Sequence, residues 1–249
     1  ASVVVTDRTQ VHGLPSLVSA ASRHVTVRFE EVDGHGILPV DAPPAGAVFQ
    51  AAYAFRRYLQ RTLPQHLARR PRSRSAARGD LPAAVEVPAD VGRRWPRVDR
   101  RLLQGEEGLS SASIDHRGGP GPLRGGSAAG RQRLAAFIDT HFAGYDENRN
   151  HPDEDAGSGL SPYLHFGHVS AHEILARVLR HERWTPARLA RAATGAKNGW
   201  WGVSRGAEAF LDQLVTWREL GANTCARRPD YDRFESLPAW AVATLDAHA

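Results

Sequence analysis

The sequence contains no methionine among its 249 residues and a single cysteine, Cys225. One cysteine excludes a disulfide framework and a cysteine-based metal site, and it is typical of a reducing cytoplasm. A chain of this length normally carries several methionines, so their absence indicates an internal portion of a longer reading frame. We therefore expect a cytoplasmic protein of which these residues form one part.

Long apolar runs are missing as well. No stretch approaches the roughly 18 apolar residues that a membrane span requires, so we expect no membrane partner. A hydrophobic content of 41% nevertheless indicates a globular chain with a core of its own, and it argues against a fibre or a disordered tail.

Lysine is almost absent, because Lys197 is the only one among 32 basic residues, which face 27 acidic residues. Arginine stays charged at any accessible pH and binds phosphate or carboxylate through two parallel hydrogen bonds. This bias favours nucleic acid or phosphorylated ligands as partners. A GC-rich codon supply would produce the same bias, and composition leaves the two open.

The basic charge gathers in residues 56–101, which hold 13 arginines against 4 acidic residues for a net charge of +9. The rest of the chain therefore carries a net charge of −4. A run of this kind is typical of a solvated surface, and also of a surface that binds a polyanion. Both interpretations stay open.

The pattern of residues 1–70 predicts α/β structure. Residues 3–5 form a continuous apolar run typical of a buried strand, residues 14–21 have helical spacing, and residues 25–29 alternate as a half-buried strand does. Together they predict a βαβ unit, which is part of a Rossmann-like parallel sheet. A second helix, 55–63, is expected to end at Pro64.

The remainder predicts a linker followed by an all-α domain. Residues 71–129 are rich in Pro, Gly, Ser and Arg and show little periodicity, as an interdomain linker does. Residues 130–249 show helical spacing. Ser127 is a candidate N-cap, Ser170-x-x-Glu173 is a capping box, and a further helix is expected from about residue 204 to 220.

One loop suits a phosphate. Small residues at 157–159 allow a ligand to approach the backbone closely, and two hydroxyls lie near a helix start. Turn chemistry alone would also select these residue types, so both explanations stand. His165, His168 and His172 have the spacing of one helix face, unless the first two precede the helix. Their pattern is not the His-Glu-x-x-His zinc motif, so we expect packing or hydrogen-bonding histidines and no metal.

Arg218 lies four residues after Leu214 and seven after Leu211, in the middle of an apolar helix face. A guanidinium there needs either a carboxylate in the core or an anionic ligand. The adjacent Trp217, and the pair formed by Trp200 and Trp201, either pack in the core or stack on bases. The sequence leaves these alternatives open.

Three motifs occur in order along the second half of the chain. They are Tyr145-x-x-x-Arg149-x-x-Pro152, then Ser158-Gly-Leu-Ser-Pro-Tyr-Leu-His-Phe-Gly167, then Phe210-Leu-Asp-Gln-Leu-Val-Thr-Trp-Arg-Glu-Leu220-Gly-Ala-Asn-Thr-Cys225. Together they resemble the photolyase/cryptochrome family, and most closely the class II cyclobutane pyrimidine dimer photolyases. Residues 33–39 and 52–56 are also similar to that family's α/β domain.

The resemblance implies a light-driven lyase that splits pyrimidine dimers in DNA by electron transfer from FAD, after flipping the dimer out of the duplex. It implies a monomer with dimer-containing DNA as its partner and an antenna chromophore of unknown identity. By position, the FAD-binding residues would be Tyr145, Gly157, Ser158, Gly159, Leu160, Ser161 and Arg218, and the DNA-binding residues Arg149, Gln213 and Trp217. No catalytic residue is assigned, because the family's electron-relay segments match positions beyond Ala249, and for the same reason we expect these 249 residues alone to bind flavin weakly.

Two departures from the family pattern support alternatives. Gly159 stands where relatives often have arginine, and Trp217 stands where class II members often have a second arginine. A cryptochrome-like flavoprotein photoreceptor without repair activity is therefore the first alternative. The second is a non-enzymatic nucleic-acid binder that uses the basic residues 56–101.

Overall fold

The computed structural model describes residues 2–67, 86–98, 113–118 and 121–248. These fall into two compact units, one made of residues 1–71 and 126–249 and the other of residues 72–125. Residues 68–85 and 99–101 of the basic stretch 56–101 lie outside the described residues, as do residues 71–85, 99–112 and 119–120 of the predicted linker. The second unit contains the short helix α3 (Ala89–Arg94). The predicted boundaries at residues 70 and 129 stay a prediction.

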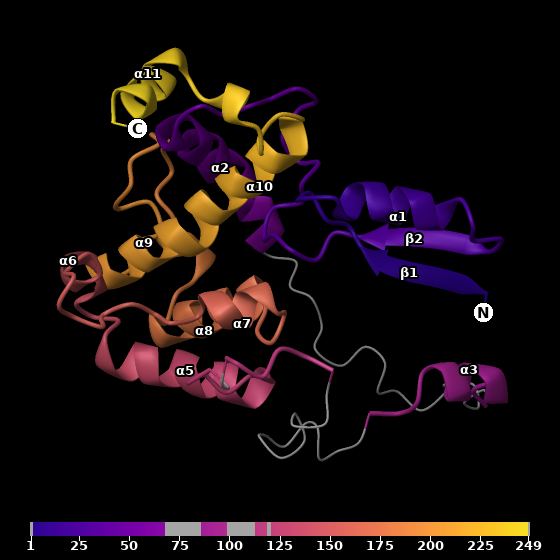
Figure 1. Cartoon of the computed structure of the whole chain (residues 1–249). Helices are drawn as coiled ribbons and strands as arrows, with labels where there is room; N and C mark the ends of the chain where they lie inside the picture. The colour runs from indigo at the N-terminus through magenta and orange to yellow at the C-terminus, as the bar shows by residue number, and fades with distance from the viewer. Residues whose placement is uncertain (1, 68–85, 99–112, 119–120, 249) are drawn as a thin grey trace. The chain divides into compact units, whose positions relative to one another are not determined.

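The chain begins with the predicted βαβ unit. Strand β1 (Val3–Asp7) and strand β2 (Arg28–Val32) pair in parallel, with helix α1 (Leu14–Ser22) between them in sequence and beside them in Figure 1. The prediction of a buried first strand is wrong, because Val3 and Val5 are 42% and 57% exposed. Among the described residues β1 has a single partner strand, and two strands with one helix cannot cover both faces of the sheet.

Helix α2 (Ala52–Leu67) belongs to the main core. Phe55, Leu59 and Leu63 recur every four residues and are at most 3% exposed, so one face of α2 is fully buried. The helix does not end at Pro64 as predicted. Pro64 lies in the last turn, where its missing N–H removes only one backbone hydrogen bond and the preceding turns hold the helix in place.

The rest of the first unit is helical, in agreement with the predicted fold class. A π-helical turn (Asp212–Trp217) joins α9 directly to α10, so that α9, the turn and α10 run as one rod in Figure 1. Among the described residues, no helix combines the length and the apolar character needed to cross a bilayer. The helices are α5 (Ser127–Thr140), α6 (Tyr145–Asn148), α7 (Ser161–His165), α8 (Ala171–His181), α9 (Arg205–Leu211), α10 (Arg218–Arg227) and α11 (Ala239–Ala247), with 3₁₀ turns at Pro186–Arg188 and Phe234–Ser236.

Two of the helix starts test the expected caps. The capping box is confirmed in its first half, since the Ser170 hydroxyl accepts a hydrogen bond of 3.1 Å from the Glu173 amide at the start of α8. The prediction for Ser127 is wrong. Ser127 is already the first helical residue of α5, and the preceding Gly126, at φ 97°, donates its amide to His168 Nδ1.

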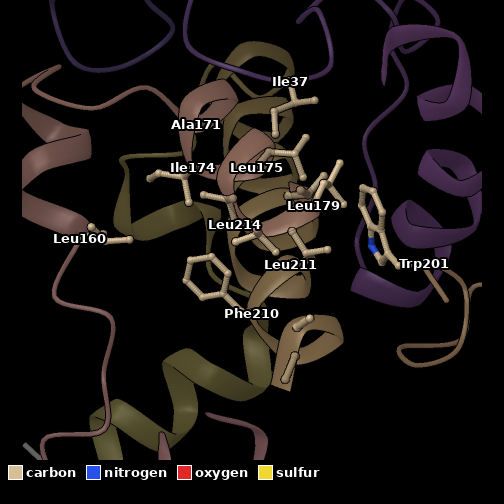
Figure 2. Close-up of a cluster of buried hydrophobic side chains, with 14 of the residues drawn as sticks. Ile37, Leu160, Ala171, Ile174, Leu175, Leu179, Trp201, Phe210, Leu211 and Leu214 are labelled. Atoms are coloured by element: carbon tan, nitrogen blue, oxygen red, sulfur yellow. The ribbon is translucent and has the colours of Figure 1, made fainter. Parts of the chain in front are cut away.

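The core lies between α8 and the α9 rod. Figure 2 shows Ile174, Leu175 and Leu179 of α8 facing Phe210, Leu211 and Leu214, with Trp201 on the side of α2. Both Trp200 and Trp201 are 6% exposed and therefore pack in the core rather than being free to stack on bases. Phe137, Phe142, Tyr145 and Phe210 form an aromatic cluster whose ring centroids lie 5.0 to 5.9 Å apart.

Gly206, in the first turn of α9, tests how tightly the rod packs. A Cβ at this position would lie 2.0 Å from the carbonyl oxygen of Phe142, which is backbone and cannot swing away. We expect Gly206→Ala to lower the free energy of unfolding by about 2 kcal/mol or more. Gly221→Ala on α10 is the matched control, because its Cβ would meet nothing within 4 Å and should stabilise the helix by about 0.5 to 1 kcal/mol. Equal urea midpoints for the two variants, measured by circular dichroism, would contradict this packing.

Candidate functional site

An open cavity of about 450 Å³ gathers half of the predicted site residues. One wall comes from α6 and the loop after it, another from the π-helical turn, and α2 and the loop before α9 complete the lining. Five predicted residues contribute: Tyr145, Arg149, Gly157, Gln213 and Trp217. Arg56, Asn150, Lys197 and Asp212 line it as well, although the sequence did not single them out as site residues.

The two walls meet because α6 packs against α9. The ring of Tyr145 contacts Phe210 edge-on at 5.5 Å, and Asp146 forms an ion pair of 3.0 Å with Arg205. Gln213 and Trp217, four residues apart, then line the same cavity from the π-helical turn. The helix predicted for residues 204–220 is present, but its sequence gave no sign of the π-helical turn.

Cations and rings dominate the cavity. The guanidinium carbon of Arg149 lies 5.7 Å from the centroid of the Tyr145 ring, and Arg149 Nε is buried without a hydrogen-bond partner among the described residues. Burial raises the pKa of Tyr145, so its hydroxyl stays protonated at neutral pH. Trp217 is 49% exposed and offers an open indole ring. The arrangement suits a ligand that combines an anionic group with a flat ring.

Arg56 and Asp212, which both line this cavity, form a forked ion pair. Arg56 Nε donates to Asp212 Oδ1 at 2.9 Å and Nη2 donates to Oδ2 at 3.2 Å, with side chains only 12% and 3% exposed. The pair joins α2 to the π-helical turn. One sequence feature could have pointed to this pair: the polar residues Arg56 and Gln60 lie four positions apart, next to the apolar stripe of α2.

Only Gly157 of the predicted phosphate loop lines the cavity. Arg133 of α5 reaches over the loop and donates to the carbonyl oxygens of Ser158, at 2.8 Å, and Gly157, at 3.2 Å. The side chain of Leu160 is 1% exposed and belongs to the core, and Ser161 is the first residue of α7. Ser158, Gly159, Leu160 and Ser161 therefore lie outside the cavity lining, and their binding role stays a prediction.

Arg218 also lies outside this lining, next to a buried carboxylate that the sequence analysis missed. Glu219 is 4% exposed and accepts a hydrogen bond of 2.7 Å from the Ile37 amide, while Arg218 Nη1 lies 3.9 Å from Glu219 Oε1. The sequence analysis placed Arg218 on the apolar helix face, but Glu219 lies there. The π-helical turn is the reason, because it accommodates one extra residue and so moves residue 219 onto the face that α-helical spacing assigns to 218. The role of Arg218 toward a ligand stays a prediction.

The three histidines have separate environments. His168 Nδ1 accepts from the Gly126 amide, and burial lowers the pKa of His172, which is half-buried. His165 packs edge-on against Phe166, with ring centroids 4.8 Å apart. In the part of the chain that the structure describes, no group of three or more His, Cys, Asp or Glu side chains could hold a metal ion.

Comparison with known proteins shows that the chain is similar to deoxyribodipyrimidine photo-lyases. No protein-family model matches it. It is 28% identical over 230 residues to the deoxyribodipyrimidine photo-lyase of Oryza sativa subsp. japonica, 32% identical over 124 residues to that of Potorous tridactylus, and 32% identical over 144 residues to that of Streptomyces griseus. The chain is a relative of the photolyases.

The photolyase relatives are longer than this chain. The match to the Oryza sativa protein covers 90% of this chain but 38% of that protein. The match to the Potorous tridactylus protein covers 50% of this chain and 20% of that protein, and the match to the Streptomyces griseus protein covers 56% and 27%. The fold is that of a photolyase, since a class III photolyase from Agrobacterium tumefaciens superposes with a TM-score of 0.56 over 92% of this chain and 42% of its own, at 18% identity.

Gly159 allows a test of the loop geometry. Its φ of +62° is a conformation that alanine adopts at a cost of about 1 to 2 kcal/mol, and a Cβ would lie 2.4 Å from Arg133 Nε. We expect Gly159→Ala to lower the free energy of unfolding by at least this amount and Gly157→Ala, whose Cβ meets nothing within 4 Å, to change it little. Arg133→Ala in the Gly159→Ala background should recover part of the loss. A fully additive double mutant in thermal unfolding would show that Arg133 does not constrain position 159.

Glu219 predicts a pH dependence of stability. Burial raises its pKa to about 7 from an ordinary value of 4.5, so the folded state retains a proton that the unfolded state releases. The free energy of unfolding should therefore fall as the pH rises from about 4.5 to 7, by about 3 kcal/mol in total, and stay level above pH 7. Glu219→Gln should remove this contribution, whereas Glu235→Gln, at an exposed position, should not. Identical urea-unfolding profiles for these two variants across this pH range would refute the assignment.

Proposed function

We propose that the protein is a deoxyribodipyrimidine photo-lyase, which binds FAD in its helical part and splits cyclobutane pyrimidine dimers in DNA under light. The observation that carries this proposal is the convergence of Tyr145, Arg149, Gly157, Gln213 and Trp217 on one cavity. The family resemblance selected these residues from their motifs alone. Separate segments of the chain supply them, and the fold of the photolyase relatives supports the same reading.

The residues present suit a flavin dinucleotide. Arg149 Nε is a buried donor that no described residue pairs with, and no described atom lies within 4 Å of the Cβ position at Gly157, so a phosphate can approach the backbone there. Tyr145, Gly157 and the following residues up to Ser161 would hold the phosphates, and Arg218 would approach from α10. When bound, reduced flavin would absorb light and then supply the electron that opens the dimer.

The DNA side would be served by three side chains of the same cavity. Gln213 is half-buried and carries an amide that both donates and accepts, as recognition of a flipped base edge requires. The exposed ring of Trp217 offers a stacking surface, and Arg149 offers a cation for the backbone phosphate. These roles account for an exposed tryptophan on a π-helical turn in which Asp212, Leu214, Val215 and Thr216 are buried.

The decisive experiment is repair of an oligonucleotide with one thymine dimer under blue light, using the protein as its gene encodes it. We expect light-dependent recovery of thymine absorbance. Trp217→Ala should weaken binding of the dimer oligonucleotide about 5- to 160-fold, the loss of one stacking contact of about 1 to 3 kcal/mol. The control is Trp240→Ala, since Trp240 is 72% exposed on α11 and lies outside the cavity lining.

Two outcomes would replace the proposal. A flavin-loaded protein that leaves dimers intact would indicate a cryptochrome-like photoreceptor, the alternative that Gly159 and Trp217 favour. Strongly salt-dependent binding that is indifferent to both dimers and flavin would indicate a nucleic-acid binder acting through its basic residues.

A further inference from the structure

Lys197, the only lysine of the chain, lies at the edge of the cavity. Its side chain is exposed, and among the described residues it makes no hydrogen bond and no ion pair. Lysine is rare in this sequence, with one among 32 basic residues, so arginine is the residue expected at a generic basic position. An unpaired ammonium beside a cavity is available to a ligand.

The backbone that leads into Lys197 is firmly held by α2. The Gly195 amide donates to Gln60 Oε1 at 2.7 Å, and Gln60 Nε2 donates back to the Ala196 carbonyl at 3.0 Å. Arg56 Nη1 also donates to the Gly195 carbonyl at 3.2 Å. Gln60 is only 6% exposed, so the loop is fixed by a buried amide rather than by a surface contact.

Gly195 shows that this position is sterically defined. Its φ is +83°, and a Cβ there would lie 2.9 Å from the carbonyl oxygen of Tyr53. The chain therefore approaches α2 more closely than any other residue type would permit. The flexible stem of Lys197 begins two residues later, so its ammonium samples a limited region at the mouth of the cavity.

The charges around the cavity do not balance. Both oxygens of Asp212 are committed to Arg56, which leaves Arg149 and Lys197 as cations with no carboxylate among the residues that line the cavity. With three cations and one carboxylate, the lining carries a formal charge of +2. Two unmatched cations in the lining of one cavity favour an anionic ligand there.

We propose that Lys197 is a phosphate-binding residue of this cavity. The ammonium would donate to a phosphate oxygen, and Arg149, which lines the same cavity from another segment, would supply a second cation. The identity of the ligand rests on the proposed function, in which the phosphate belongs either to the DNA backbone next to the dimer or to the pyrophosphate of FAD. The chemistry at Lys197 is the same in both cases.

The first measurement is the salt dependence of binding to the dimer oligonucleotide. If Lys197 contacts a DNA phosphate, Lys197→Gln should weaken binding several-fold and reduce the slope of log K against log salt by about 0.7 to 0.9. Lys197→Arg should restore the slope, because it keeps the charge. Arg191→Gln is the matched control, since Arg191 is an exposed cation of the same loop region that does not line the cavity.

The second measurement is the affinity for FAD, followed by flavin fluorescence in the dark. A several-fold loss in Lys197→Gln with an unchanged DNA salt slope would assign the phosphate to FAD. The reverse pattern would assign it to DNA. Either result supports a phosphate contact at Lys197, provided that thermal unfolding of the variant matches that of Arg191→Gln.

The third measurement separates this inference from the proposed function. Acylation of Lys197 by an amine-reactive reagent is followed by peptide mass spectrometry with and without pyrophosphate, and we expect pyrophosphate to slow it. If neither DNA nor FAD binds, the proposed function fails, and protection by pyrophosphate still decides whether Lys197 binds phosphate. Unchanged labelling, together with a Lys197→Gln variant that matches Arg191→Gln in both binding assays, overturns the inference.

Discussion

The ion pair between Arg56 and Asp212 holds together parts of the chain that are 156 residues apart in sequence. Both side chains are almost fully buried, so neither charge can be left without the other; removing one partner of such a pair typically costs 3 to 5 kcal/mol. The fork fixes direction as well as distance, because two parallel hydrogen bonds allow only one relative orientation of α2 and the π-helical turn. With Gln60 one turn further along α2, the same helix also fixes the loop before α9. Three sides of the cavity thus depend on residues of a single helix.

Much of this arrangement follows from local sequence patterns. The apolar stripe of α2 and the cap at Ser170 were predicted correctly because each depends on residues within a few positions of one another. The parallel βαβ unit was also predicted correctly, because each of its three elements has its own local pattern, although its strands pair 25 residues apart. The convergence of Tyr145 and Gln213 could be expected only from the family motifs. Physical reasoning on either segment alone would not have brought them together.

The failures have a common cause in tertiary context. Strand β1 was predicted to be buried, but burial depends on what covers a strand and not on its own composition. Helix α2 continues past Pro64 because the turns that precede it are fixed by the core. The buried helix face shows the effect most clearly: α-helical spacing predicts Arg218 on it, whereas the structure has Glu219 there. A single extra residue in the π-helical turn shifts the helix face on which every later residue lies. No local pattern of residues 212–217 gives the position of that insertion.

Arg133 and Gly159 place a constraint on how this loop can vary. The guanidinium of Arg133 occupies the space in which a side chain at position 159 would begin, and it satisfies two carbonyl oxygens of the loop. Arginine at position 159, as the family often has, would have to displace the arginine that already lies there. A side chain at position 159 therefore moves the Arg133 guanidinium from its place, and the carbonyl oxygens of Gly157 and Ser158 lose the donor that α5 supplies.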